Sequence, residues 1–347
     1  MRQRFLRNLF SYSNHHRAAK RNISASSVYR VPPATLGTNE PLRTENEATR
    51  LRYGSLVDAT TDALPEKAKI VIVGGGAQGM AIAYKLATQG YGEETVVLDQ
   101  GQIGGGSTWH SAGIISQLSH KAVETRLSRL SRELYKGVEE KGYFTGWKEV
   151  GSIYVAQTKN RLHYFKRLRS EALHQRVECE IITDMDRLAE LCPLIRVDDL
   201  VGGLWVPNDG VANPFEICRG LAALSKDLGV RLVENCELQE VLTKNGSVSG
   251  VITSLGFIAC ENFVNTAGLW ARKIGHLSRP RVQIPLHPAE HYYLHTKPVA
   301  GVSPDTPVVH DPDANVYIRE NEGRFLGGGY EPKAKVTMQR GWFYKED

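Results

Sequence analysis

A short apolar run that ends abruptly in glycine constrains the fold more than any other feature of the chain. Residues 70–73 read Ile-Val-Ile-Val, and residues 74–79 read Gly-Gly-Gly-Ala-Gln-Gly. A short β-branched run is typical of a buried parallel strand, and the glycines match G-x-G-x-x-G. A helical period follows from Met80 to Ala87, and Gly90 stands where a helix-ending glycine is expected. This order predicts the first unit of a doubly wound α/β sheet.

Each position of the glycine turn has a physical use in binding a dinucleotide. The first glycine permits the tight turn, the second lets a pyrophosphate approach the backbone, and the third lets the helix pack against the strand. The free N–H groups at the helix start then face the phosphates. We therefore expect the cofactor to contact this turn at Gly74, Gly76, Ala77, Gln78 and Gly79.

An acidic residue ends the second expected strand, which covers residues 95–99. Asp99 is placed to accept hydrogen bonds from a ribose 2′-hydroxyl, with Gln100 beside it. A carboxylate at this position disfavours a 2′-phosphate, which argues against NADP. The motif alone does not separate NAD from FAD.

Two further segments are expected to approach the cofactor. A glycine-rich connection leads to residues 107–113, where Trp109 and His110 are adjacent. This pair is open to two interpretations, ordinary packing or a place beside the cofactor. Residues 263–271 read as a strand, an Ala-Gly turn and a helix start, which is either a simple corner or a second close approach. The candidate contacts in these segments are Ser107, Thr108, His110, Ala112, Gly113, Ala267, Gly268 and Trp270.

The first residues of the chain differ in composition from the rest. No Asp or Glu occurs from Met1 to Asn39, while arginines and serines are frequent, although the whole chain of 347 residues has a net charge of only +5. This composition predicts a mitochondrial presequence over residues 1–30, the alternative being a plain basic tail. Residues 31–66 are expected to form a linker or arm.

Composition also excludes several classes of protein. No aromatic and basic platform for nucleic acid follows the basic tail, and no apolar segment reaches the ~20 residues of a membrane span. The five cysteines are widely spaced without a C-x-x-C motif, so we expect no metal site and no disulfide framework.

The rest of the chain is expected to mix helices and strands. Apolar residues recur at helical spacing over residues 121–140, which predicts an amphipathic helix. Residues 237–260 predict a small antiparallel meander, with a separate strand from Phe263. Residues 284–330 are interpreted as several long strands.

The motifs together resemble one family. VIVGGGAQGMAIAYKLATQGYGEETVVLDQ, GSTWHSAG, VPNDGVANP, FVNTAGLWARKIG and PLHPAEHYYLHT, between about Ala68 and about Pro332, are similar to the mitochondrial sarcosine and dimethylglycine dehydrogenases. The family includes the regulatory subunit of pyruvate dehydrogenase phosphatase. The resemblance implies FAD in a glutathione-reductase-like nucleotide fold with an interleaved mixed-sheet substrate domain. The FAD-binding domain would span residues 67–140 and 205–280, and the substrate domain residues 141–204 and 281–347.

The resemblance also implies a chemistry. In the dehydrogenases the Trp-His pair carries the histidine that is linked covalently to the flavin, which is His110 here. The substrate would be an N-methyl amino acid, sarcosine or dimethylglycine, positioned by His291, Tyr293 and Arg319. Electrons would pass to electron-transfer flavoprotein in the mitochondrial matrix.

Two alternatives remain open at this point. The regulatory subunit resembles the chain strongly around residues 286–291 but typically lacks the Trp-His pair; the role would then be non-catalytic, with a phosphatase catalytic subunit as partner. An NAD-linked dehydrogenase rests on the glycine motif alone. Family members also continue beyond this chain with a segment that completes the FAD site and, in the dehydrogenases, a folate-binding region. We therefore expect a C-terminally truncated chain without folate binding.

Overall fold

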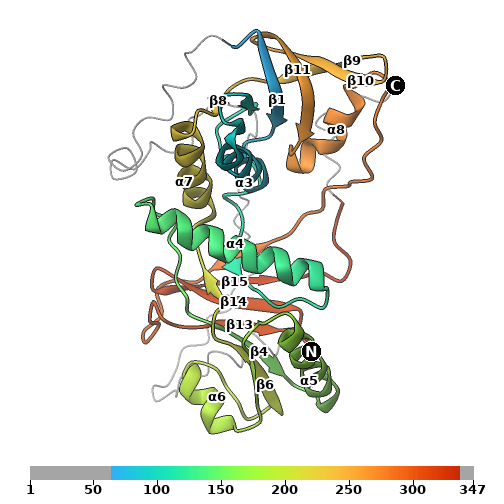
Figure 1. The fold of residues 1–347 in the computed structure, drawn as a ribbon. Coiled ribbons are helices and arrows are strands. Elements are labelled where there is room, and N and C mark those ends of the chain that lie inside the picture. Colours follow the sequence, from blue (N-terminus) through green and yellow to red (C-terminus); the bar gives the residue numbers. More distant parts are fainter. Residues whose placement is uncertain (1–63, 337–347) are drawn as a thin grey trace, which may run out of the picture.

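The structure is a computed structural model that describes residues 64–336. The expected presequence, nearly all of the expected arm, and residues 337–347 lie outside this range. Two large sheets dominate it, and in Figure 1 the first lies above the second, with the long helix α4 crossing between them. The α/β fold class expected from the sequence is confirmed.

The first sheet has six strands in the order β8-β2-β1-β11-β10-β9. Strands β1, β2, β8 and β11 pair in parallel, whereas β9, β10 and β11 form the antiparallel meander. The strand bounds are Lys67–Val73 (β1), Thr95–Leu98 (β2), Arg231–Val233 (β8), Leu238–Lys244 (β9), Ser247–Thr253 (β10) and Gly256–Asn265 (β11).

The second sheet has seven strands in the order β12-β15-β14-β13-β4-β6-β5. Its bounds are Ser152–Ala156 (β4), Glu180–Ile182 (β5), Gly202–Val206 (β6), Tyr293–His295 (β12), Val308–Asp311 (β13), Val316–Asn321 (β14) and Arg324–Gly329 (β15). The chain thus leaves the first sheet after β2, builds part of the second, returns, and leaves again. A short ribbon of β3 (Ile114–Ile115) and β7 (Gly210–Val211) lies in the connections between them.

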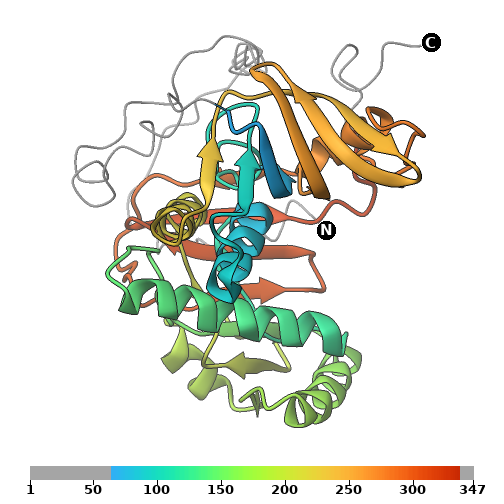
Figure 2. The same ribbon diagram turned by 45° about the horizontal axis from the view of Figure 1, so that its top comes forward.

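Helices cover both sheets, as Figures 1 and 2 show from two directions. Side chains of α3 and α7 share one core cluster with Ile70 and Ile72 of β1, while Val71 and Val73 belong to a cluster on the other face. Strand β1 is therefore buried on both sides, as its unbroken apolar run predicts. The helices are α3 (Ala77–Leu86, followed by a π turn at Ala87–Tyr91), α4 (Ala122–Glu140), α5 (Lys159–His174), α6 (Met185–Leu191), α7 (Pro214–Asp227), a 3-10 turn at Gly268–Trp270, and α8 (Ala271–His276).

Two sequence expectations about strands are wrong. The last strand of the meander and the strand expected from Phe263 are one continuous ten-residue strand, β11, which pairs with β10 over its first half and with β1 along most of its length. Several long strands were expected over residues 284–330, but none forms before Tyr293, where β12 begins. Pro285 and Pro288 explain this, because proline lacks the N–H that a strand ladder requires.

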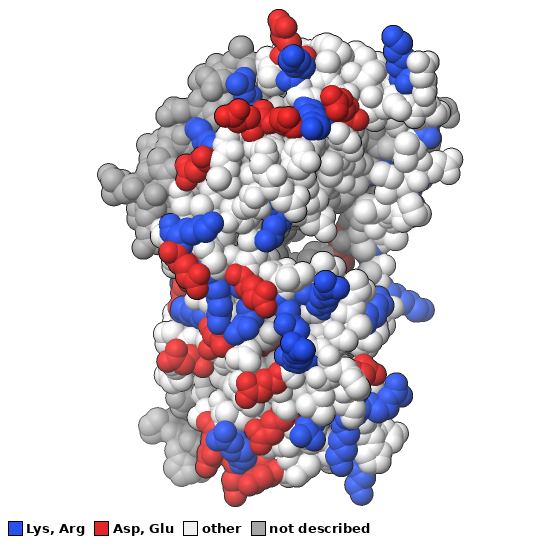
Figure 3. Space-filling model, in the orientation of Figure 1, with Lys and Arg blue, Asp and Glu red and all other residues white. Residues whose placement is uncertain are grey.

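The amphipathic helix predicted at residues 121–140 forms as α4, but its apolar side chains are covered only toward its C-terminal end. Val138 is buried against the first core cluster, whereas Val123, Leu127 and Leu130 remain 52–64% exposed. Ion pairs of Glu149 with Arg132 and Lys136 fix the helix to the following loop. On the face seen in Figure 3, acidic and basic side chains are intermixed over this region.

A buried carboxylate marks the junction of the short ribbon with the second sheet. Asp209 has no exposed surface and accepts hydrogen bonds from the backbone N–H and the side-chain amide of Gln117, at 2.8 and 3.4 Å. Its carbonyl oxygen accepts from Gly151 N, which leads into β4. Burial raises the pKa of Asp209 to about 6, although these hydrogen bonds oppose the shift.

Candidate functional site

A large pocket opens where the parallel strands of the first sheet end. Its volume is about 860 Å³, within the range of cofactor sites. Its wall is formed by the glycine turn after β1, the end of β2, the loop at residues 100–113, the start of α7, the start of β9, and residues 266–274. Ligands of doubly wound sheets bind at this carboxyl edge.

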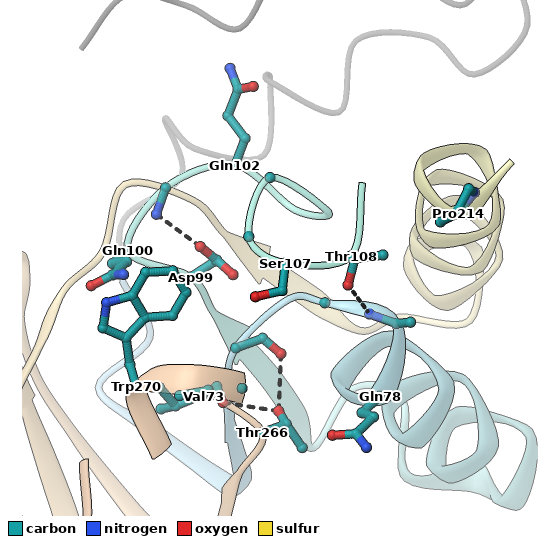
Figure 4. A pocket seen from close by; sticks show the side chains of 18 of the residues that line it. Val73, Gln78, Asp99, Gln100, Gln102, Ser107, Thr108, Pro214, Thr266 and Trp270 are labelled. Carbon is teal, nitrogen blue, oxygen red and sulfur yellow. Dashed lines mark hydrogen bonds between the residues drawn. The ribbon is translucent and has the colours of Figure 1, made fainter. Parts of the chain in front are cut away.

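Figure 4 shows how the side chains of this pocket converge. All the cofactor contacts expected from the sequence line it except Gly79, His110 and Ala112. The lining residues among those predicted are Gly74, Gly76, Ala77, Gln78, Asp99, Gln100, Ser107, Thr108, Gly113, Ala267, Gly268 and Trp270.

Close backbone contacts require glycine at positions 74 and 79, whereas position 76 faces the pocket. Gly74 has φ +107°, and a Cβ there would lie 2.3 Å from Thr266 O, where β1 and β11 end side by side. A Cβ on Gly79 would lie 1.9 Å from Gly74 O, so this glycine packs α3 against the turn and does not reach the pocket. At Gly76 a Cβ would point into the pocket and meet only Thr108 Oγ1 within 4 Å, at 3.0 Å. The open space above Gly76 fits a pyrophosphate.

Asp99 is held by the backbone on both sides. Its Oδ2 accepts from Gly75 N at 2.7 Å and its Oδ1 accepts from Gly101 N at 2.8 Å. Burial raises the pKa of Asp99, and these two donors oppose that rise. A carboxylate offers about four acceptor positions, so those that remain can receive ribose hydroxyls.

Two threonines bind the loops around the turn. Thr108 Oγ1 accepts from Ala77 N at 3.1 Å, which brings the loop at residues 100–113 over the start of α3. Thr266 Oγ1 lies 2.9 Å from Val73 O and 3.0 Å from Gly74 O, so the hydroxyl donates to the end of β1. Trp270 lies beside Asp99 and Gln100 in Figure 4.

The predicted flavin-linking histidine is near the pocket without lining it. His110 is exposed, and its ring packs on Trp109 with centroids 3.7 Å apart. Its neighbours Thr108 and Ser111 do line the pocket. Partial burial lowers the pKa of the His110 imidazole, which favours the neutral ring.

Two of the three predicted substrate residues, Tyr293 and Arg319, lie on strands of the second sheet, and His291 lies two residues before β12; none of them lines the pocket. Tyr293 of β12 and Tyr317 of β14 are both paired with Gly328 of β15, the strand between them, so the two tyrosines lie on the same face. Arg319 lies two residues after Tyr317 on β14 and therefore shares this face. The His291 ring stacks on Tyr330 at 5.1 Å and lies 6.4 Å from the Tyr317 ring. The fold therefore brings His291, Tyr293 and Arg319 to one face.

Charge on this face is only partly neutralised. His291 Nδ1 lies 3.1 Å from Glu331 Oε2. Arg319 donates from Nη1 to Glu320 O at 3.0 Å, but its buried Nε has no hydrogen-bond partner among the described residues. Burial lowers the pKa of Arg319, and nearby acidic groups oppose this. A guanidinium group suits a carboxylate, because its N–H groups donate two parallel hydrogen bonds.

Sequence reasoning missed several residues of both regions. Asn235, Cys236, Glu237 and Leu238 follow β8 and line the pocket. The rule that ligands bind at strand carboxyl ends would have found them. Tyr317 was missed because its place beside His291 depends on strand pairing.

No helix in the described range 64–336 is long and apolar enough to cross a membrane. Within the same residues, no three His, Cys, Asp or Glu side chains come together as metal ligands would.

Comparisons with known proteins agree with this geometry. The chain is 39% identical over 289 residues to the mouse pyruvate dehydrogenase phosphatase regulatory subunit, covering 83% of this chain and 33% of that protein. It is 34% identical over 275 residues to mouse sarcosine dehydrogenase, covering 77% and 29%. It thus spans about a third of the length of these relatives.

A solved structure is similar over most of the fold. The L-proline dehydrogenase of P. horikoshii superposes with a TM-score of 0.73 at 29% identity, covering 78% of this chain and 71% of that one. The model of the family DAO, FAD dependent oxidoreductase, matches residues 69–343. These matches favour FAD over NAD at the glycine turn, and the chain belongs to the DAO family of FAD-dependent oxidoreductases.

Proposed function

We propose that the protein oxidises the N-methyl group of a small amino acid, sarcosine or dimethylglycine, with FAD as the hydride acceptor. The observation that carries this proposal is the group of His291, Tyr293, Tyr317 and Arg319 on one face of the second sheet. It joins a cation, an imidazole and two phenols, which suits a substrate with a carboxylate and an amine. Relatives named for oxidation of sarcosine and of 4-methylaminobutanoate support it.

The residues of this face have separate roles in the proposal. Arg319 binds the substrate carboxylate through its guanidinium group. His291, oriented by Glu331 at 3.1 Å, accepts the ammonium proton, so that the amine is neutral when its C–H bond breaks. Tyr293 and Tyr317 fix the position of the methyl group. FAD, when bound, supplies the hydride acceptor.

The same proposal assigns the cofactor contacts. The glycine turn would hold the pyrophosphate, Asp99 the ribose, and Trp270 one wall of the pocket. A covalent link at His110 is part of the proposal, supported by its position between the pocket residues Thr108 and Ser111. Electrons would pass to electron-transfer flavoprotein in the mitochondrial matrix.

Anaerobic titration tests the proposal. The purified full chain is loaded with FAD, and sarcosine, dimethylglycine or glycine is added while the flavin absorbance is followed. Bleaching by an N-methyl substrate and not by glycine is expected. Precipitation with acid then tests the link, because flavin should remain on the wild-type polypeptide and wash away from a His110→Ala variant. Flavin that washes away from both excludes the link.

A second candidate is a non-catalytic regulatory subunit that binds a phosphatase catalytic subunit. The exposed ring of His110 and the 39% identity to the mouse regulatory subunit favour it. Co-purification with a pyruvate dehydrogenase phosphatase catalytic subunit, with no bleaching by either N-methyl substrate, would establish this alternative.

A further inference from the structure

A second pocket lies on the other side of helix α8. Its volume is about 470 Å³, and it is lined by Arg272, His276, Arg281, Gln283, Ile284, Pro285 and His287. Lys273 and Ile274 of the same helix line the first pocket. Residues four apart share one helix face, so Arg272 and His276 point away from the nucleotide site together. The short helix separates two distinct cavities.

The charge of the second pocket has a single sign. Two guanidinium groups and two imidazoles contribute to its wall, and no carboxylate does within the part of the chain that the structure describes. The sequence from Asn262 to Ala289 contains no Asp or Glu at all. Nearby carboxylates pair with other cations, Glu237 with Lys273 at 3.1 Å and Glu240 with Arg279 at 3.9 Å. The described wall of the pocket is therefore rich in basic groups, which favour an anionic ligand.

Two basic groups in this wall are in direct contact. Arg272 Nη1 lies 3.0 Å from His287 Nε2, so the imidazole must present its lone pair to the guanidinium. Arg272 and Arg281 also make other interactions within the chain, so an entering anion competes with those.

We propose that this pocket binds the phosphate group of a small molecule. Two arginines match the double charge and the planar, two-point hydrogen bonding of a phosphate better than they match a single carboxylate. The volume lies in the range of small-molecule sites, and Ile284 and Pro285 supply an apolar wall for the remainder of the ligand. The site is separate from the proposed amine oxidation and does not depend on it.

Calorimetric titration of the full chain with inorganic pyrophosphate, at constant ionic strength, tests this site. Saturable binding is expected, weakened at least tenfold in Arg272→Gln and in Arg281→Gln. Arg279→Gln is the matched control, because this arginine lies on the same segment and does not line the pocket. Circular dichroism identifies a variant that fails to fold, and the other arginine variant then decides.

Pyrophosphate could also enter the glycine turn of the first pocket, so the titration is repeated with Gly76→Val, whose side chain fills that turn. Binding that survives in Gly76→Val and is lost in Arg281→Gln supports the second pocket. The opposite pattern overturns the proposal. Malonate is the second ligand tested, and binding of malonate as tight as that of pyrophosphate would reject the phosphate assignment.

Discussion

The glycine turn at residues 74–79 is built in the opposite way to the aromatic face, the face of the second sheet that carries His291, Tyr293, Tyr317 and Arg319. At the turn, backbone atoms set the geometry, and a single added carbon at Gly74 or Gly79 would lie about 2 Å from a carbonyl oxygen. On the second sheet, side chains set the geometry, and His291 and Tyr293 are exposed on or beside an edge strand. The first region therefore tolerates little substitution, whereas the second can change its chemistry without loss of the fold.

The largest predicted effect tests the rigidity of the turn. Gly79→Val should destabilise the fold by about 3 kcal/mol or more, because its Cβ cannot fit beside Gly74 O without separating α3 from β1. Gly137→Ala in α4 is the matched control, since a Cβ there meets nothing within 4 Å, and it should stabilise the helix by up to about 1 kcal/mol. Urea unfolding measures both, and equal midpoints would contradict the close contact.

Asp209, at the junction of the short ribbon with the second sheet, should make the stability of the fold depend on pH. The pKa of Asp209 is about 6 when folded, above its value of about 3.9 in an unfolded chain, so folding favours the protonated acid. The stability from this group is present below about pH 4 and is lost as the pH rises through 6. Relative to Asp209→Asn, the wild type should lose about 3 kcal/mol between these limits. Unfolding free energies across this range measure it, with the exposed Asp305→Asn as control; a flat difference would refute the shift.

A substitution on the aromatic face should change substrate affinity and leave the stability of the fold unchanged. Arg319→Gln is expected to weaken sarcosine binding to the FAD-loaded protein by about 10-fold to 100-fold, the loss of one charge-assisted hydrogen-bonded pair. The unfolding midpoint should stay near that of the wild type. Arg324→Gln, an exposed arginine on the neighbouring strand, provides the control. Equal sarcosine affinity in both variants would remove Arg319 from the site.

The smallest effect is expected on α4, where the apolar stripe is covered only in part. Leu127 is 59% exposed, so Leu127→Ala should change stability by no more than about 0.5 kcal/mol. Leu221 of α7 has no exposed surface, and Leu221→Ala should cost about 2–5 kcal/mol. Thermal unfolding compares them. A loss of more than 1 kcal/mol at Leu127 would mean that its side chain is covered in solution.

The first region could be predicted from the sequence because its signals are local. The β-branched run, the spacing of Gly74, Gly76 and Gly79, and the acidic strand end lie within thirty residues. The structure places Gly74, Gly76 and Asp99 around one pocket. For the second region, the sequence indicated individual candidate residues but not how they are arranged. Its arrangement depends on the pairing of β12, β15 and β14, which no short motif encodes. The break in the strand before Tyr293 was overlooked, although Pro285 and Pro288 gave the signal.

The order in which the chain visits the two sheets also constrains how the protein is made. Strand β4 is synthesised early, yet its parallel neighbour β13 follows only after β8, β9, β10 and β11 have been added to the other sheet. Contacts between such distant parts of a chain form slowly. Until β13 is in place, the early half of the second sheet has an open strand edge at β4, and open edges of this kind are sites where chains aggregate.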